Sequence, residues 1–341
     1  MLVTHDRALE PYDVPVMWTY YGAAMNSAAR TTLVSLTSAA AVLALLAVRA
    51  PSLAGGQRNG TDDAVRALAG AIDIHVHSEP DSRPRSIDAI DVAKLARSKG
   101  MRAIVLKNHY ESTASLVYLV RKEVPGIEVF GGIDLNLTVG GMNPAAVEYM
   151  TEVTGGWGRI VWMSTFDAEN QVRYSKENRP FVSVSRNGAL LSEVKAVISV
   201  IAKHGLTLAT GHVSAPESLL LLREGKRQGV PHMVVTHAMN APILMDVAQM
   251  REAAALGAFI EFVGGSLATA DAQTRMDRFA ETIRSVGPQY CILSSDLGQK
   301  GNALPPDGFA AFIGAMRIRG FTDQELDRMS KQNPARLLGL P

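Results

Sequence analysis

The sequence predicts an α/β protein that forms a (β/α)8 TIM barrel behind an N-terminal signal-like or disordered extension. From residue 71 onward, short β-rich runs alternate with longer stretches in which apolar residues have helical spacing. This pattern is typical of a parallel sheet with crossover helices. Eight such units occupy about 270 residues, the usual size of this barrel. A doubly wound open sheet is the alternative, but no glycine-rich phosphate-binding motif follows the first strand.

The predicted strands are short apolar runs rich in β-branched residues, and several of them end in polar side chains. Side chains two residues apart on a strand point to the same side, so alternate residues of each run should face one side of the sheet. The eight runs cover residues 71–77, 102–109, 128–136, 159–165, 206–214, 232–239, 258–265 and 290–298.

Helical stretches separate the strands, and each of them ends at or near a glycine that can take the left-handed C-cap conformation. They cover residues 86–100, 111–126, 143–156, 191–205, 215–229, 244–257 and 270–287. The closing stretch NPARLLGL, residues 333–340, predicts a capping turn and a helix that seals the barrel, because asparagine and proline suit a helix start.

One connection, residues 166–190, is too long for a simple crossover. Its second half alternates in polarity and contains Asn187-Gly188, which predicts a hairpin. Long loops in compact domains tend to be lids or binding loops. Arg173, Tyr174 and Arg179 are therefore candidates for a lid over the barrel.

The first 70 residues are expected to form an extension outside the barrel domain, residues 71–341. Arg30 follows Met25 and precedes an apolar run, and cleavage after Ala54, in a stretch of small residues, would suit a secretory signal. This predicts an exported or periplasmic protein with no stable membrane insertion after signal removal. A cytoplasmic protein with an ordinary amphipathic helix, or a membrane-anchored one, is the alternative, although the run is short for a span.

Charge and cysteine content exclude several classes of protein. Lysine and arginine number 34 against 33 acidic residues, the net charge is +1, and no basic run stands out. We therefore expect a small-molecule substrate and no nucleic acid as partner. The single cysteine, Cys291, excludes an intrachain disulfide and is expected to be buried. The sequence leaves the oligomeric state open, with a homo-oligomer as one option.

Five of the eight histidines stand at predicted strand ends, where the active sites of such barrels lie. An aspartate ends the eighth strand in the same way. Imidazoles and a carboxylate from distant parts of the chain are ligands that a divalent transition metal prefers. The sequence therefore predicts a metal site at the barrel mouth. The residues are His75, His77, His109, His212, His237 and Asp296.

These motifs resemble those of the amidohydrolase superfamily of metal-dependent hydrolases. The matching features are HVH on the first strand, TGH on the fifth, VTH on the sixth, SSD on the eighth and the closing NPARLLGL. The resemblance covers residues 71–341. The chain is most similar to a branch without an established substrate, which has VLKNH on the second strand and DLGQ after the eighth.

The resemblance implies a role for each metal-site residue. His75, His77, His212 and Asp296 would bind one zinc-like ion, and Asp296 would also take a proton from the attacking water. His237 would contact that water, polarise the substrate or hold a second ion. One zinc ion is the expectation, with two as the alternative. A bound cation lowers the pKa of water toward neutrality, and a nearby carboxylate or imidazole moves the proton.

The sequence departs from the two-metal members of this superfamily, whose bridging carboxylated lysine belongs on the fourth strand. That strand has no lysine here, but Lys107 on the second strand shares its parity with His109. Lys107 could bind a substrate carboxylate or oxyanion, pair with an acidic neighbour such as Asp134, or be carboxylated and bridge two ions. It is also a candidate catalytic residue.

Substrate contacts are expected from residues around the metal motifs. Arg83 and Arg85 in the first loop could bind an anion through their fork geometry. Asp134 and Asn136 at the end of the third strand could bond the substrate or the imidazoles. Lys107 and His109 complete this set, and Glu261 on the seventh strand could pair with Lys107 or serve in packing.

Three functions remain open on the sequence alone. The first is a metal-dependent hydrolase that cleaves a C–N or C–O bond in an amide, lactone or ester of a small molecule that can be anionic. The second is a metal-dependent non-oxidative decarboxylase, because the basic residues near the mouth could hold a carboxylate. The third is a metal- or solute-binding barrel without turnover, which would have no need of proton-handling residues.

Overall fold

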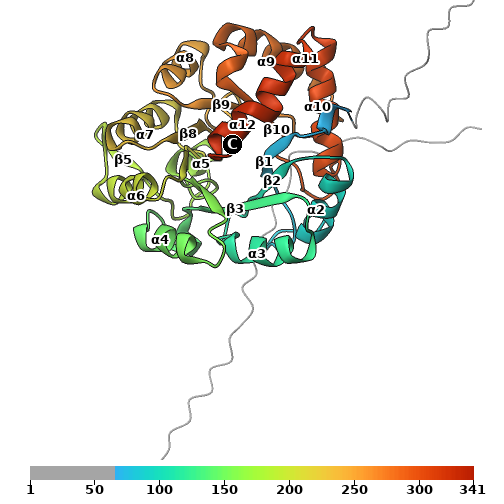
Figure 1. Ribbon diagram of the computed structural model, residues 1–341. Helices are drawn as coiled ribbons and strands as arrows, with labels where there is room; N and C mark the ends of the chain where they lie inside the picture. The colour runs from blue at the N-terminus through green and yellow to red at the C-terminus, as the bar shows by residue number, and fades with distance from the viewer. Residues whose placement is uncertain (1–65) are drawn as a thin grey trace, which may run out of the picture. The chain divides into compact units, whose positions relative to one another are not determined.

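The computed structural model describes residues 66–341, and its main sheet has eight parallel strands with helices between them (Figure 1). Their order follows the chain, β1-β2-β3-β4-β7-β8-β9-β10, so each crossover joins neighbouring strands. The predicted (β/α)8 barrel is confirmed. The strands are β1 (Ile72–Val76), β2 (Ala103–Leu106), β3 (Glu128–Asp134), β4 (Gly158–Trp162), β7 (Thr207–Ala209), β8 (His232–Val235), β9 (Phe259–Val263) and β10 (Cys291–Ser294).

The barrel closes where the first and last strands meet, just beyond the end of β10. Val76 and Leu297 form a parallel bridge there. The His77 backbone N–H donates to the Leu297 carbonyl at 2.8 Å, and the Asp296 N–H donates to the His75 carbonyl at 3.0 Å. Closure therefore brings the two ends of the predicted metal motif, far apart in the chain, side by side.

Helices surround the barrel and also continue after the last strand (Figure 1). Three short turns accompany them: η1 (Leu137–Val139), η2 (Pro288–Tyr290) and the π-helical turn η3 (Arg328–Gln332). The helices are α2 (Ala89–Ser98), α3 (Ala114–Glu123), α4 (Pro144–Glu152), α5 (Glu169–Tyr174), α6 (Ser192–Lys203), α7 (Ala215–Gln228), α8 (Val247–Ala255), α9 (Ala272–Val286), α10 (Pro305–Ile318), α11 (Asp323–Asp327) and α12 (Asn333–Leu337).

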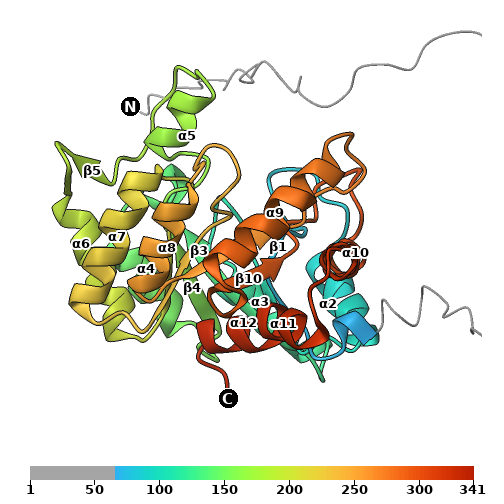
Figure 2. The ribbon, with the colours of Figure 1, turned by 90° about the horizontal axis from the view of Figure 1, so that it is seen from above.

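The long connection after β4 contains α5 and a two-stranded hairpin. Strands β5 (Ser185–Arg186) and β6 (Ala189–Leu190) pair antiparallel, as the sequence predicts. Asn187 and Gly188 between them have φ angles of 51° and 77°, the left-handed values that a tight hairpin turn requires. Figure 2 shows α5 at the opposite end of the barrel from α12.

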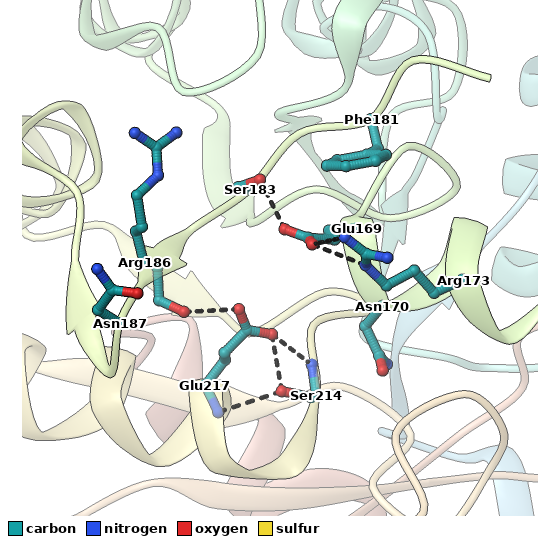
Figure 3. A pocket seen from close by; sticks show the side chains of 10 residues that line it. Glu169, Asn170, Arg173, Phe181, Ser183, Arg186, Asn187, Ser214 and Glu217 are labelled. Carbon is teal, nitrogen blue, oxygen red and sulfur yellow. Dashed lines mark hydrogen bonds and ion pairs between the residues drawn. The ribbon is translucent and has the colours of Figure 1, made fainter. Parts of the chain in front are cut away.

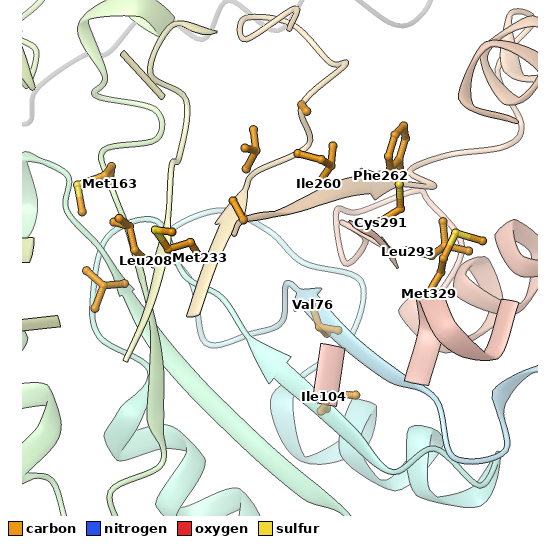
Figure 4. Close-up of a cluster of buried hydrophobic side chains, with 14 of the residues drawn as sticks. Val76, Ile104, Met163, Leu208, Met233, Ile260, Phe262, Cys291, Leu293 and Met329 are labelled. Atoms are coloured by element: carbon orange, nitrogen blue, oxygen red, sulfur yellow. The ribbon is translucent and has the colours of Figure 1, made fainter. Parts of the chain in front are cut away.

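Two apolar cores hold the barrel together. The larger lies between the strands and the surrounding helices, and Figure 4 shows part of it, including Ile104, Leu208 and Phe262. The smaller lies inside the barrel and joins residues such as Val105 and Phe130 to Leu337 of α12. Because α12 contributes to this inner core, it seals one end and leaves the other for polar side chains.

The predicted sealing helix is present, but its asparagine does not cap it. Gln332 occupies the N-cap position of α12, and η3 runs directly into it. The Asn333 amide instead donates to the carbonyls of Pro288 and Cys291 at 3.0 and 2.7 Å. The side chain therefore ties α12 to the beginning of β10. The capping expectation was wrong because a tertiary contact competed with the local one.

A β-bulge in β1 sets the direction of its two histidines. The pairing with β2 shifts register between Asp73 and Val76. Ile72 and Ile74 belong to the inner core, whereas Val76 belongs to the outer one. The bulge thus reverses the alternation after Ile74. A regular strand that buried these isoleucines inside would have turned both histidines away from the barrel interior.

The predicted signal segment, residues 25–54, lies outside the described residues. The outer core already includes Ala67 and Leu68, which are buried just before the predicted start of the barrel domain. Within residues 66–341, no helix has the length and apolar character needed to cross a membrane.

Candidate metal centre

Five imidazole rings from four strand ends form a closed circle at the barrel mouth. Going around it, the ring centroids of His75, His77, His109, His212 and His237 are 5.3, 4.9, 6.2 and 4.9 Å apart, and 6.0 Å separates the last from the first. All five side chains are buried. The structure therefore brings together the histidines that the sequence placed at strand ends.

His75, His77 and Asp296 form the tightest group of metal-ligand type among residues 66–341. One atom of each lies within 4.8 Å of the others. The Nε2 atoms of His75 and His77 each lie 3.2 Å from Asp296 Oδ1. This group contains three of the four residues that the resemblance assigned to the first ion.

The other nitrogen of each of these imidazoles is held by the protein. His75 Nδ1 lies 3.1 Å from Glu261 Oε1, and His77 Nδ1 lies 3.1 Å from the backbone carbonyl of Lys107. A carboxylate or carbonyl neighbour requires Nδ1 to carry a proton. The Nε2 lone pairs are then directed toward Asp296, which is the arrangement that metal-binding histidines use.

His212 and His237 form an adjacent pair, with their Nε2 atoms 3.2 Å apart. His212 Nδ1 lies 2.9 Å from Gln171 Oε1 of α5. His237 Nδ1 is buried and has no hydrogen-bond partner among the described residues. The resemblance assigned His212 to the same ion as His75, His77 and Asp296. In the structure, the imidazole nearest to His212 is that of His237.

Two of the candidate residues stand on left-handed backbone. His237 has a φ of 26° and Asp296 a φ of 50°, which is uncommon for residues other than glycine. The His237 N–H donates to Glu261 Oε2 at 2.9 Å, and this bond helps to hold the conformation. Such backbone is concentrated at functional sites, where the surrounding structure maintains it.

Burial keeps most of the imidazoles neutral. It lowers the pKa of His77 to about 3 and that of His237 to about 4. Burial also lowers the pKa of His109 and His212 well below the ordinary value. His75 differs: burial and the nearby Lys107 lower its pKa, but the two carboxylates that it contacts outweigh them and raise it.

The carboxylates at the site are ionised or close to it at neutral pH. Burial raises the pKa of Asp296, but His75 and other imidazoles outweigh this effect and hold it well below its usual range. Glu261 behaves in the same way, with a pKa of about 2. Burial raises the pKa of Asp134 to about 6 against the opposing charge of Lys107.

This donor set fits a divalent cation. Metal binding needs neutral imidazoles and a deprotonated carboxylate. Burial keeps His77, His212 and His237 neutral, and Asp296 is ionised. His75, whose pKa is raised, would release its proton as the ion binds. The carboxylates of Asp134, Glu261 and Asp296 outnumber Lys107, the lysine at their centre, so the cluster carries an excess of negative charge. His75, His77 and Asp296 would hold the ion, with His212 and His237 beside it.

Lys107 is completely enclosed in this cluster. Its Nζ lies 3.2 Å from His75 Nε2 and 3.6 Å from Asp134 Oδ2, and it stands 5.1 Å from the centre of the Trp162 ring. The pairing with Asp134, one of the alternatives that the sequence left open, is therefore present. The same amine also lies beside a candidate metal ligand.

The remaining predicted contacts, Asp134 at the end of β3 and Asn136 just after it, support His109. Its Nδ1 lies 2.9 Å from Thr165 Oγ1 and 3.1 Å from Asp134 Oδ2. The Asn136 amide donates to Thr165 Oγ1 and to the His109 carbonyl, both at 2.7 Å. Its carbonyl oxygen accepts from Ser164 and from two backbone N–H groups. Protein groups thus already use the hydrogen-bonding capacity of Asn136.

The two arginines of the first loop have different surroundings. Arg85 is buried and ion-paired with Asp81, at 2.6 and 2.8 Å. Arg83 is half-buried, donates from Nε to the Tyr110 hydroxyl at 2.7 Å and lies 4.4 Å from the centre of the Phe166 ring. Within residues 66–341 no carboxylate pairs with Arg83. Its terminal nitrogens therefore remain available to an anion.

Sequence reasoning missed several residues that contact the site, among them Phe166, Gln171 and Asp73. Phe166 packs on His109 with ring centroids 4.1 Å apart, and Gln171 contacts His212. Asp73 Oδ1 accepts from the backbone N–H groups of His75 and Ser295, at 3.1 and 3.0 Å. A charged residue inside the apolar run AIDIHVH was a signal for Asp73, whereas nothing local marked the other two.

Glu261 faces the site, but it does not pair with Lys107, one of the two roles that the sequence offered. Oε1 accepts from the Ser294 hydroxyl at 2.7 Å and contacts His75 Nδ1, as described above. Lys107 instead pairs with Asp134. Glu261 therefore links β9 to β1, β8 and β10 at the barrel mouth.

The predicted lid residues lie on α5 and the segment after it. Arg173 pairs with Glu169 at 2.6 Å, Tyr174 is exposed, and Arg179 pairs with Asp167 at 2.6 Å. The helix is tied to the site, because the Asn170 amide donates to the His212 carbonyl at 3.0 Å. Glu169, Asn170 and Arg173 of α5 also line a cavity (Figure 3).

The barrel is similar to those of several solved structures. An amidohydrolase from Pseudomonas aeruginosa has a TM-score of 0.58 at 13% sequence identity, over 80% of this chain and 97% of that chain. A zinc-bound amidohydrolase from Burkholderia multivorans has a TM-score of 0.57 at 15% identity, over 80% and 100%. The 2,6-dihydroxybenzoate decarboxylase from Rhizobium has 0.50 at 12%, over 80% and 99%. The resemblance to amidohydrolases is thus confirmed for the fold.

No curated protein matches the sequence. A family model does match, over residues 70–261. This range contains all five imidazoles of the circle and Glu261, while the strand that leads to Asp296 lies beyond it. The match covers more than half of the chain, which therefore belongs to DUF6282, a family of unknown function.

Proposed function

We propose that the protein is a metal-dependent hydrolase of the amidohydrolase type, with zinc as its ion, and that it cleaves a C–N or C–O bond in a small molecule. The observation that carries this proposal is the convergence of His75 and His77 Nε2 on Asp296 Oδ1, with both Nδ1 atoms held elsewhere. The zinc-bound structure with the same fold supports the choice of ion.

Asp296 is the best placed of these residues to handle a proton. Its side chain is 26% exposed, against 1% and 2% for His75 and His77, so it alone of the three reaches the open mouth. The ion, when bound, would lower the pKa of water and polarise the substrate. Asp296 would accept the proton of the attacking water and return it to the leaving group. His237, neutral through burial, would orient that water or the scissile group.

Arg83 would anchor an anionic group on the substrate. Its guanidinium lies over Phe166, which in turn packs on His109 of the imidazole circle. A substrate carboxylate bound there would place the scissile bond toward the ion. Lys107 would contact a carboxylate or oxyanion at the ion itself.

A metal-dependent decarboxylase is the second candidate. The same cations, Arg83 and Lys107, could hold the carboxylate that leaves as carbon dioxide. The fold is shared with a decarboxylase as well as with hydrolases, and fold alone does not separate these reactions.

A panel of lactones, amides and esters, run beside aromatic carboxylates with carbon dioxide detection, separates the two reactions. Hydrolysis without carbon dioxide release supports the first candidate, and carbon dioxide release supports the second. Stoichiometric metal with no turnover on either panel would instead favour a binding protein.

Metal analysis of variants tests which residues hold the ion. His77→Ala should lose metal and activity together, and His212→Ala should show whether the adjacent pair holds the same ion. Lys107→Met should chiefly weaken substrate binding. If it halves the metal content instead, Lys107 bridges two ions.

Export remains a separate proposal, which rests on residues 25–54 alone. N-terminal sequencing of the protein from cell fractions tests it. A mature chain that begins after Ala54 and lies outside the cytoplasm supports export, whereas an intact N-terminus in the cytoplasm contradicts it.

A further inference from the structure

We propose that the cavity beside α5 binds a small organic anion with a flat apolar group, and that its occupancy is transmitted to His212. The cavity measures about 640 Å³. It lies between α5, the hairpin segment and the beginning of α7, and Figure 3 shows its lining side chains. A volume of this size suits a small organic molecule.

The acidic groups in the cavity wall are already satisfied by protein donors. Glu169 accepts from Arg173 at 2.7 Å and from the Ser183 hydroxyl at 2.7 Å. Glu217 accepts from the hydroxyls of Ser185 and Ser214, at 2.8 and 2.7 Å. Glu217 also stands in the first turn of α7, where the helix dipole stabilises a negative charge. Glu169 is thus paired with Arg173, and the oxygens of Glu217 are occupied by hydroxyl and backbone donors.

The unused capacity of the wall consists mainly of donors. Arg186 lines the cavity, and no carboxylate within residues 66–341 forms an ion pair with it. Asn187 follows it at the hairpin turn, and its left-handed backbone fixes the direction of this corner. A guanidinium that forms no ion pair within residues 66–341, next in the chain to an amide, suits a carboxylate or a similar anion.

An apolar wall faces these donors. Phe181 lines the cavity and is 39% exposed, and the Arg173 guanidinium lies 5.4 Å from the centre of its ring. Figure 3 shows Phe181 and Arg173 on one side and Arg186 and Asn187 on the other. The ring of an aromatic carboxylate can therefore pack on Phe181 while its carboxylate contacts the Arg186 guanidinium.

Helix α5 connects the cavity to the candidate metal centre. Glu169, Asn170 and Arg173 line the cavity. Asn170 also donates to the His212 carbonyl at 3.0 Å, and the next residue, Gln171, contacts His212 Nδ1 at 2.9 Å. A ligand that fixes α5 therefore fixes the backbone and the ring of His212.

Binding is tested by calorimetric titration of the full chain with benzoate and with benzamide, its neutral isostere. Benzoate should bind more tightly, and Arg186→Gln should weaken it by about tenfold or more, the effect of losing one charge-assisted contact. Arg223→Gln, the same change on the exposed face of α7 where Arg223 pairs with Glu252, should have no effect.

A His77→Ala variant separates this site from the metal centre, because a carboxylate could also bind an ion there. Benzoate binding that persists in His77→Ala and is lost in Arg186→Gln belongs to the cavity. Equal affinity of the wild type and Arg186→Gln, or equal binding of benzoate and benzamide, would overturn the proposal. These measurements need no turnover, so their outcome does not depend on whether the protein is a hydrolase.

Transmission to His212 is tested by the zinc affinity, measured by chelator competition with and without benzoate. Benzoate should change this affinity in the wild type. Benzoate should still bind to the Gln171→Ala variant, but it should change the zinc affinity less, because the contact between residue 171 and His212 Nδ1 is lost. An unchanged zinc affinity in the wild type would refute the transmission. With an active substrate, competitive inhibition by benzoate that is lost in Arg186→Gln identifies the cavity as part of the substrate site, and non-competitive inhibition that is lost in Arg186→Gln identifies a separate effector site.

Discussion

The two nitrogens of each candidate imidazole ligand have different neighbours, and this difference decides which nitrogen is free. Glu261 holds His75 Nδ1 and also accepts from the His237 backbone, so one carboxylate orients residues on two strands. Glu261 is a positioning residue, because it contacts the candidate ligands and not the reacting groups. Such outer partners commonly tune metal affinity.

Glu261→Gln should weaken zinc binding by about tenfold or more, because an amide cannot accept from His75 and from the His237 backbone through two oxygens. Chelator competition measures the dissociation constant. Glu128 lies at the beginning of β3, at the end of the barrel away from the mouth, and pairs with Arg102. Glu128→Gln, a change of the same kind, should leave the dissociation constant unchanged. Equal zinc affinity in the wild type and Glu261→Gln would show that Glu261 serves only in folding.

Asp296→Asn should lower turnover by about a hundredfold or more while substrate affinity changes little, because the amide cannot accept the proton of the attacking water. The measurement is kcat and KM on whichever substrate the panels identify, with zinc content checked in parallel. Turnover at the wild-type level with zinc retained would remove Asp296 from the mechanism.

At the scale of elements, the barrel mouth depends on two departures from regular strand geometry. The bulge in β1 turns His75 and His77 inward, and the loop after β10 carries Asp296 on left-handed backbone. Gly298 follows in that loop with a φ of 125°, and a Cβ placed there would lie 1.9 Å from the His77 carbonyl oxygen. The close approach of this loop to β1 therefore requires glycine.

Gly298→Ala should weaken zinc binding and lower the free energy of unfolding by more than the ~1 kcal/mol that an L residue typically costs at positive φ. The added methyl group must push the loop from β1 and so separate Asp296 from His77. Gly301→Ala is the matched control, because Gly301 has a φ of 90° but no atom within 4 Å of its Cβ position. Urea unfolding and chelator competition measure both quantities. Equal effects of the two changes would argue against the close contact.

At the scale of the whole molecule, an ion at this site would join the first strand to the last. His75 and His77 follow the bulge in β1, while Asp296 comes from the loop after β10. The barrel closes at this seam through few backbone bonds. A ligand that binds only the folded state stabilises it by mass action.

Removal of metal should therefore lower the melting temperature. Free zinc at about a thousand times its dissociation constant contributes ~4 kcal/mol, which corresponds to a shift on the order of 10 °C for a domain of this size. Differential scanning calorimetry with and without EDTA measures it. The His77→Ala variant should melt at the same temperature in both, and an EDTA effect of equal size there would place the stabilising ion elsewhere.

The sequence by itself determined the barrel and the set of residues at its mouth. Strand and helix periodicity is local, and strand ends of a parallel barrel meet at one rim, so His75, His109 and Asp296 could be placed together from their positions alone.

The tertiary structure decided which side chains pair. Glu261 contacts His75, and Lys107 pairs with Asp134. Arg85 pairs with Asp81, whereas Arg83 donates to Tyr110 and has no carboxylate partner among residues 66–341. Asn333 ties α12 to β10 instead of capping it. Each outcome depends on side-chain contacts within about 4 Å between residues that can be close or distant in the chain, and no periodicity in the sequence encodes such distances. The bulge in β1 was also decided by the tertiary structure, because the pairing with β2 sets the register of β1.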